Sequence, residues 1–146
     1  MEREFVPAAE AMPEDKFDFA PTNGEFKGVR TFGLQVKHVA ANNYQIAAAI
    51  LGEKPPAGSE ADNGPDSIKT KADIVKYLKD SIAYSRKAFA SINESNLTGQ
   101  VQSPYGPGKA SRLGLAGLLV AHCFDHYGQM VEYLRMNGII PPASRQ

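Results

Sequence analysis

Residues 111–138 read SRLGLAGLLVAHCFDHYGQMVEYLRMNG and predict one long helix with clear ends. Ser111 is of a type that caps a helix N-terminus, since its side-chain oxygen can accept a backbone N–H bond. Gly138 can adopt the left-handed conformation that ends a helix, and the pair Pro141-Pro142 prevents the helix from resuming. The rest of the chain predicts the helices that pack against this one.

Two further segments carry apolar residues at helical spacing and similar length. Residues 31–51 begin at the capping residue Thr31 and end at Gly52, which Pro55-Pro56 follows. Residues 70–92 begin at Thr70, which forms a shortened capping box with Asp73. Both segments predict amphipathic helices that can pack side by side with the first one.

A shorter helix is predicted for residues 2–12, closed by Pro13. Four helical segments separated by prolines and glycines predict an all-α four-helix bundle. The first helix is short for its partners, so either the bundle is lopsided there or residues preceding Met1 complete it. Between the helices, residues 13–30 should be irregular, with Phe17, Phe19 and Phe26 covering the core.

The longest connection, residues 93–110, contains Ser103-Pro104-Tyr105-Gly106-Pro107-Gly108, which cannot continue a helix or a sheet. No segment shows an alternating strand pattern, so we expect an irregular loop. Loops of this length inside compact domains are often functional.

Length and composition predict a single domain over residues 1–146 with a genuine hydrophobic core. Sixteen Lys and Arg balance sixteen Asp and Glu, which leaves no general attraction to nucleic acid or to an anionic membrane. The longest apolar run is far shorter than the about 20 residues of a membrane-spanning helix. The single cysteine, Cys123, needs no oxidising compartment, and the charged start predicts a cytoplasmic protein unless a signal preceding Met1 was removed.

The chain has only three histidines, and all lie on predicted helices: His38, His122 and His126. An α-helix turns by about 100° per residue, so positions 122 and 126 project one turn apart from the same face. This spacing occurs in helical metal sites. The face is otherwise mainly apolar, where ring nitrogens without partners are costly and a metal ion removes that cost. Periodicity places His38 at a bundle edge or in a cleft, and as the remaining imidazole it is the natural third ligand.

Three neutral imidazoles suit zinc, nickel, iron or copper, and we place zinc and nickel before iron and copper. Three protein ligands with an open fourth position are typical of catalytic zinc sites. The alternative is that the histidines are structural and hydrogen-bonded, in a protein that binds a small ligand without metal.

Residues elsewhere in the sequence exclude several other kinds of site. Cys123 is rotated by about 100° from His122 and should pack in the core rather than act as a fourth ligand. It also occupies the position at which a zincin peptidase has its glutamate, which excludes that class. Asp125 is either an acceptor for a ligand histidine or a solvated acid. The glycine-containing stretches lack the spacing of a phosphate-binding loop.

The sequence resembles the DinB family of DinB/YfiT-like metalloenzymes over nearly the whole chain. The likeness rests on His38, on HCFDHYGQ at residues 122–129 and on YLRMNG at residues 133–138 with the proline pair. It implies a four-helix bundle that holds one divalent metal through three histidines, here His38, His122 and His126, and it implies frequent homodimers. Related bundles include thiol-dependent transferases and isomerases that use mycothiol or bacillithiol, and metal-dependent hydrolases. The first helix is shorter than this family pattern.

The leading hypothesis is therefore a metal-dependent enzyme, a thiol-dependent transferase or a hydrolase of a small molecule. The bound cation would lower the pKa of a thiol or water in the open position. No general acid or base is identified; Gln129 is a candidate orienting group, and Tyr105 or Arg112 could position substrate. The alternative function is a non-catalytic metal-binding stress or interaction protein built on a dimeric bundle.

Overall fold

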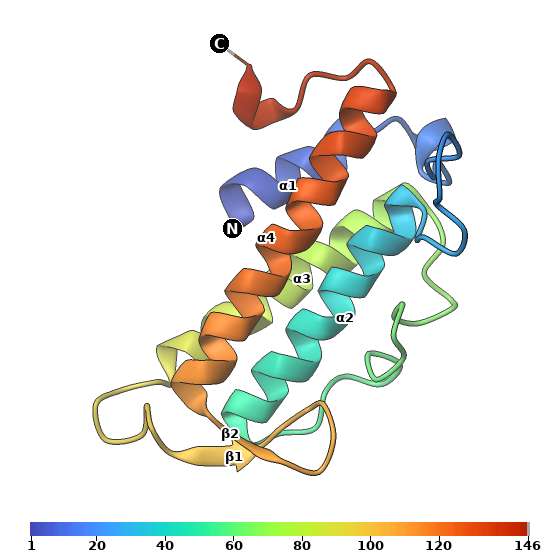
Figure 1. Ribbon diagram of the computed structural model, residues 1–146. Coiled ribbons are helices and arrows are strands. Elements are labelled where there is room, and N and C mark those ends of the chain that lie inside the picture. Colours follow the sequence, from blue (N-terminus) through green and yellow to red (C-terminus); the bar gives the residue numbers. More distant parts are fainter. Residues whose placement is uncertain (146) are drawn as a thin grey trace.

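The computed structural model describes residues 1–145, which form four α-helices and one short hairpin (Figure 1). The helices are α1 (Glu2–Ala11), α2 (Phe32–Leu51), α3 (Lys71–Ala90) and α4 (Arg112–Met136). Two short 3₁₀ turns, Glu14–Lys16 and Pro142–Ser144, lie outside them. The predicted all-α bundle with a short first helix is confirmed. No helix of the described residues is long and apolar enough to cross a membrane.

The predicted helix ends are set by the expected capping groups. The hydroxyl oxygens of Thr31, Thr70 and Ser111 accept hydrogen bonds from the backbone N–H three residues later, at 3.3, 3.1 and 3.1 Å. Gly52 and Gly138 have φ values of +74° and +72°, in the left-handed region that glycine tolerates. Each of the three hydroxyl oxygens accepts a bond from a backbone N–H that the start of the helix leaves without a partner.

Helix α2 is the centre of the bundle. It packs against α3 on one side and α4 on the other, and α1 lies across α3 and α4 (Figure 1). As a result α2 is buried almost all round, including polar residues that a surface helix would expose. Such residues need internal partners, and their partners position the candidate site described below.

Two expectations for the connecting segments were wrong. Residues 93–110 are not wholly irregular, because β1 (Gln100–Gln102) and β2 (Lys109–Ser111) pair antiparallel, with Val101 opposite Ala110. Strands of three residues are too short to show a readable alternation. Phe17 and Phe19 pack on the core as predicted, but Phe26 is 39% exposed.

Candidate metal centre

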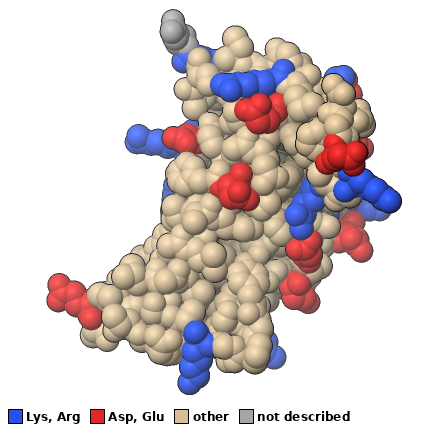
Figure 2. All heavy atoms as spheres, in the orientation of Figure 1, with Lys and Arg blue, Asp and Glu red and all other residues tan. Residues whose placement is uncertain are grey.

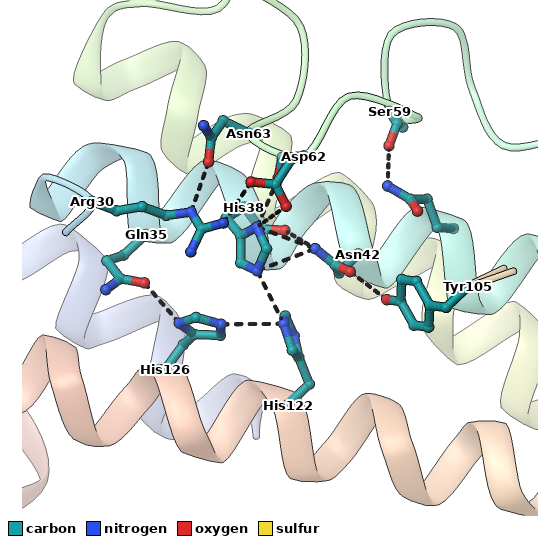
Figure 3. A network of polar contacts seen from close by, with 11 residues as sticks. Arg30, Gln35, His38, Asn42, Ser59, Asp62, Asn63, Tyr105, His122 and His126 are labelled. Carbon is teal, nitrogen blue, oxygen red and sulfur yellow. Dashed lines mark hydrogen bonds and ion pairs between the residues drawn. The ribbon is translucent and has the colours of Figure 1, made fainter. Parts of the chain in front are cut away.

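The three histidines meet where α2 and α4 pack against each other (Figure 3). The Nε2 atom of His122 lies 3.2 Å from Nε2 of His38 and 3.2 Å from Nε2 of His126. One nitrogen from each ring belongs to a group whose members all lie within 4.8 Å of one another. The structure thus brings together all three residues that the sequence singled out.

The hydrogen bond at the opposite nitrogen of His38 determines which nitrogen carries the proton. Nδ1 of His38 lies 2.7 Å from the backbone carbonyl oxygen of Asp62. A carbonyl oxygen can only accept a hydrogen bond, so Nδ1 must carry the hydrogen. In the neutral ring Nε2 is then unprotonated, and its lone pair faces the other two histidines.

A chain of four side chains sets the tautomer of His126 in the same way. The Asp125 carboxylate can only accept, so Nε2 of Gln129 donates to it at 3.1 Å. The Gln129 oxygen therefore faces Gln35, whose Nε2 donates to it at 2.7 Å. The remaining Gln35 oxygen lies 2.7 Å from Nδ1 of His126, which must donate. His126, too, turns an unprotonated Nε2 toward the centre of the site.

His122 differs from the other two rings. It is only half-buried, and its Nδ1 atom is buried without a hydrogen-bond partner in the part of the chain that the structure describes. The protein therefore leaves the tautomer of His122 open. It is also the least buried of the three rings.

Burial keeps these imidazoles neutral. It lowers the pKa of His122 and of His126 to about 4, with the neighbouring imidazoles acting in the same direction. It also lowers the pKa of His38. Neutral imidazole is the form that binds a metal ion, so the site is ready to bind one at neutral pH.

The spacing of the nitrogens fits a single ion. Two imidazole nitrogens bound to one tetrahedral zinc, each at about 2.0–2.1 Å, lie roughly 3.3–3.4 Å apart. The observed separations of 3.2 Å are close to that value. Without an ion, the lone pairs of His38 and His126 converge in a half-buried site where the nearest donors are the N–H that His122 can present and, for His38, the Asn42 amide at 3.4 Å, which is a poor hydrogen-bonding arrangement. The donor set therefore fits a divalent cation.

The loop that contacts His38 is itself anchored. Arg30 forms an ion pair of 2.5 Å with the Asp62 carboxylate and donates to the side-chain oxygen of Asn63 at 2.7 Å. Gln45 on α2 donates to the Ser59 carbonyl oxygen at 2.7 Å. These contacts hold the Asp62 carbonyl over His38 (Figure 3).

The other predicted site residues differ in how close they lie to the histidines. Tyr105 reaches the site edge, where its hydroxyl donates to the side-chain oxygen of Asn42, one turn from His38. Gln129 acts through Gln35 rather than on a ligand directly. Arg112 is not at the site, because its Nε donates to the Ile50 carbonyl oxygen at the far end of α2. Asp125 is exposed and is linked to His126 only through the two glutamines.

Sequence reasoning missed Gln35, Asp62 and Arg30. For Gln35 a signal existed: it is a polar residue on a largely apolar helix, three positions before His38, so it lies on nearly the same face. Asp62 contributes a backbone oxygen, and Arg30 acts on a loop 32 residues away. Neither leaves a local pattern in the sequence.

We expect Gln35→Ala to weaken zinc binding about 10- to 100-fold, the usual cost of removing the group that orients a ligand histidine. The substitution removes the acceptor of His126 Nδ1, so the ring is no longer held with Nε2 inward. Competition with a chromophoric chelator measures the affinity. Gln100→Ala on the exposed hairpin is the control; equal affinities of the two variants would contradict the orienting role.

Cys123 should be inert in the folded protein. Its thiol is buried, it donates to the Asn43 side-chain oxygen, and burial raises its pKa to about 12. Because the thiolate is the reactive form, we expect alkylation by iodoacetamide at pH 8 to be slower by about three orders of magnitude or more than in the unfolded chain. Mass spectrometry of the native and the guanidinium-unfolded protein measures both rates, and similar rates would show that the thiol is accessible.

Comparison with known proteins agrees with this fold. A DinB-like protein from Bacillus subtilis, known from a crystal structure, is similar with a TM-score of 0.68 and 18% sequence identity, over 94% of this chain and 85% of that chain. At this identity the likeness concerns the fold alone. A comparison with curated protein sequences gave no match. The family model of the DinB superfamily, however, matches residues 1–130. The chain therefore belongs to the DinB superfamily.

Proposed function

We propose that the protein is a metal-dependent enzyme in which His38, His122 and His126 hold one divalent cation, zinc or nickel before iron or copper. The observation that carries the proposal is the convergence of the three Nε2 atoms, with the outer nitrogens of His38 and His126 each committed to an oxygen acceptor. A purely structural role for the histidines would not require the unprotonated nitrogens to face one another.

The reaction we propose is a thiol-dependent transfer or a hydrolysis of a small molecule. A cation held by three protein ligands supplies Lewis acidity at an open position, where a thiol or a water becomes a nucleophile near neutral pH. The protein's part is to keep the rings neutral and oriented, through Asp62 and the Gln35–Gln129 pair. His122 is the least buried of the three rings, and we propose that a substrate approaches beside it.

Elemental analysis of the purified protein tests the metal, and a screen of thiol-transfer and ester substrates with and without chelator tests the reaction. We expect one equivalent of metal per chain and turnover that the chelator removes. A protein that contains no metal and takes up none at neutral pH would overturn the proposal. Stoichiometric metal without turnover of any substrate would instead favour the alternative, a non-catalytic metal-binding interaction protein.

One surface feature supports a dimer in either case. The outer face of α4 from Leu113 to Phe124 carries no charged residue, and Leu113, Leu118, Val120 and Phe124 are 57, 41, 37 and 43% exposed. Figure 2 shows that this side of the molecule is mostly uncharged over the lower half of α4. Contiguous apolar patches exposed on a protein surface usually mark an interaction site.

We propose that a second copy of the chain covers this face. If two α4 helices cross antiparallel about residues 120 and 121, Phe124 of each lies opposite Gly117 of the other, and Leu113 lies opposite Gly128. Large side chains then meet glycines at both positions.

Phe124→Glu should therefore convert the dimer to a monomer, because it places a charge opposite Gly117 in an apolar interface. Size-exclusion chromatography with light scattering measures the mass. Phe26→Glu is the matched control, since Phe26 is exposed to a similar extent, 39%, on a different face. A wild-type protein that is monomeric at all concentrations would exclude the dimer.

A further inference from the structure

A cavity of about 550 Å³ lies at the end of the bundle that the hairpin covers, and its lining begins at Gln45, two helical turns along α2 from His38. One wall is α2, through Gln45, Ala48 and Ala49, and the opposite wall is β1 with its turn, residues 101–104. Cavities of roughly 300–1,000 Å³ are typical of small-molecule sites. The cavity is therefore large enough to hold a ligand of ordinary metabolite size.

The cavity and the histidines share one face of α2. His38, Asn42, Gln45 and Ala49 follow one another at spacings of four, three and four residues, which keeps them on the same side of a helix. Gln45 lies only about 10 Å along the helix axis from His38 at 1.5 Å per residue. A ligand of moderate length with one end in the cavity would be long enough to span this distance.

Asn42 and Tyr105 lie between the cavity and the histidines along their own elements. Asn42 lies between His38 and Gln45 on α2, and Tyr105 directly follows the cavity-lining residues Ser103 and Pro104. The Tyr105 hydroxyl donates to the Asn42 side-chain oxygen, and the Asn42 amide donates to the His38 carbonyl oxygen at 2.9 Å (Figure 3). The hydroxyl and the amide are the polar groups that a ligand passing from the cavity to the histidines would meet.

The lining indicates which ligands fit. Apolar surface comes from Ala48, Ala49, Pro55, Val101 and Pro104. Two carboxylates, Glu53 and Glu60, lie at the rim, and the lining contains no lysine or arginine. Glu53 is paired with Lys87 and Tyr84, whereas Glu60 has no ion-pair partner within residues 1–145. The cavity thus disfavours anions and offers one carboxylate to a cation.

We propose that this cavity binds the non-reacting part of the substrate, an apolar group that carries an ammonium, and that Tyr105 and Asn42 contact the segment that leads to the histidines. The inference rests on the proposed function, because it assigns the cavity to the substrate of the same site. It names Glu60 as the group that selects a cation, and Ala49 as the residue whose size sets the depth of the cavity.

Three probes of equal length but different charge test the proposal: 4-phenylbutylamine, 4-phenylbutan-1-ol and 4-phenylbutyric acid. Each is titrated into the ¹⁵N-labelled full chain, and amide shifts of residues 45–49 and 101–103 report binding. We expect the amine to bind most tightly and the acid most weakly, with shifts that extend to the Asn42 side-chain amide. Equal binding of amine and acid, or shifts confined to other surfaces, would overturn the proposal.

Three variants test whether the probes bind in this cavity or elsewhere on the molecule. Ala49→Trp fills the cavity and should abolish probe binding, whereas Ala83→Trp on the exposed face of α3 should leave it unchanged. Glu60→Gln should lower the preference for the amine over the alcohol by about two- to fivefold, the size expected for an exposed ion pair. A retained preference would exclude Glu60 as the selecting group.

Zinc affinity, measured on the same samples, keeps this test apart from the test of the proposed function. Ala49→Trp should bind zinc like the wild type, because Ala49 lies about three turns from His38. If wild type binds zinc but none of the probes enters the cavity, only the substrate assignment fails. If it binds no zinc at all, the proposed function fails whatever the probes do.

Discussion

His126→Ala should remove stoichiometric metal binding and leave the helices in place. The substitution deletes one of three converging nitrogens, and the two imidazoles that remain, His38 on α2 and His122 on α4, hold a divalent ion far less well than three. The loss of affinity should exceed the 10- to 100-fold that follows from removing a group that merely orients a ligand. Elemental analysis measures the metal, and circular dichroism measures the helix content.

Glu132→Ala provides the control for that experiment. Glu132 lies on the same helix, is exposed, and contacts only Arg135 at 3.8 Å. It should retain the metal of the wild type. An unchanged metal content in His126→Ala would show that the histidine is not a ligand, and a loss of helix content would be tested further with His122→Ala, whose ring is less buried.

Phe32→Ala should lower the free energy of unfolding by about 3–5 kcal/mol, the range for deleting a buried aromatic side chain. Phe32 is fully buried at the start of α2 and packs edge-on against Phe17, with ring centroids 5.4 Å apart. For a chain of this size the loss corresponds to a fall in Tm of about 6–20 °C. Urea unfolding followed by circular dichroism measures the change.

Phe26→Ala is the matched control, since it removes the same side chain from a position that is 39% exposed. We expect a change within about 0.5 kcal/mol. A similar loss in both variants would mean that burial at Phe32 is not what stabilises the start of α2. That start carries Gln35 and His38, so its stability also bears on the site.

Most of the fold could be predicted because its signals are local. A capping hydroxyl, a left-handed glycine and a helical apolar period each act within a few residues, and the structure places all four helices within two residues of the predicted ends. The hairpin could not be predicted in this way. Its strands are held by pairing across a turn and are too short to carry a period of their own.

The site was predictable only in part. The pairing of His122 with His126 follows from the geometry of one helix. The direction of hydrogen bonding that turns their free nitrogens inward depends on Asp62 and Gln35, which belong to other segments. The substrate cavity likewise lies between α2 and β1, and its walls are more than fifty residues apart in the chain.

Four helices, their ends and the pair of imidazoles on one helical face follow from the amino-acid order alone, because each of these depends on contacts between near neighbours in the chain. The packing of the helices and loops sets the rest: His38 completes the group, acceptors on two other segments select the tautomers of His38 and His126, and a cavity forms two helical turns further along α2. These features depend on how α2, α4 and the long loops pack, and the burial of apolar surface that drives this packing carries no direction of its own.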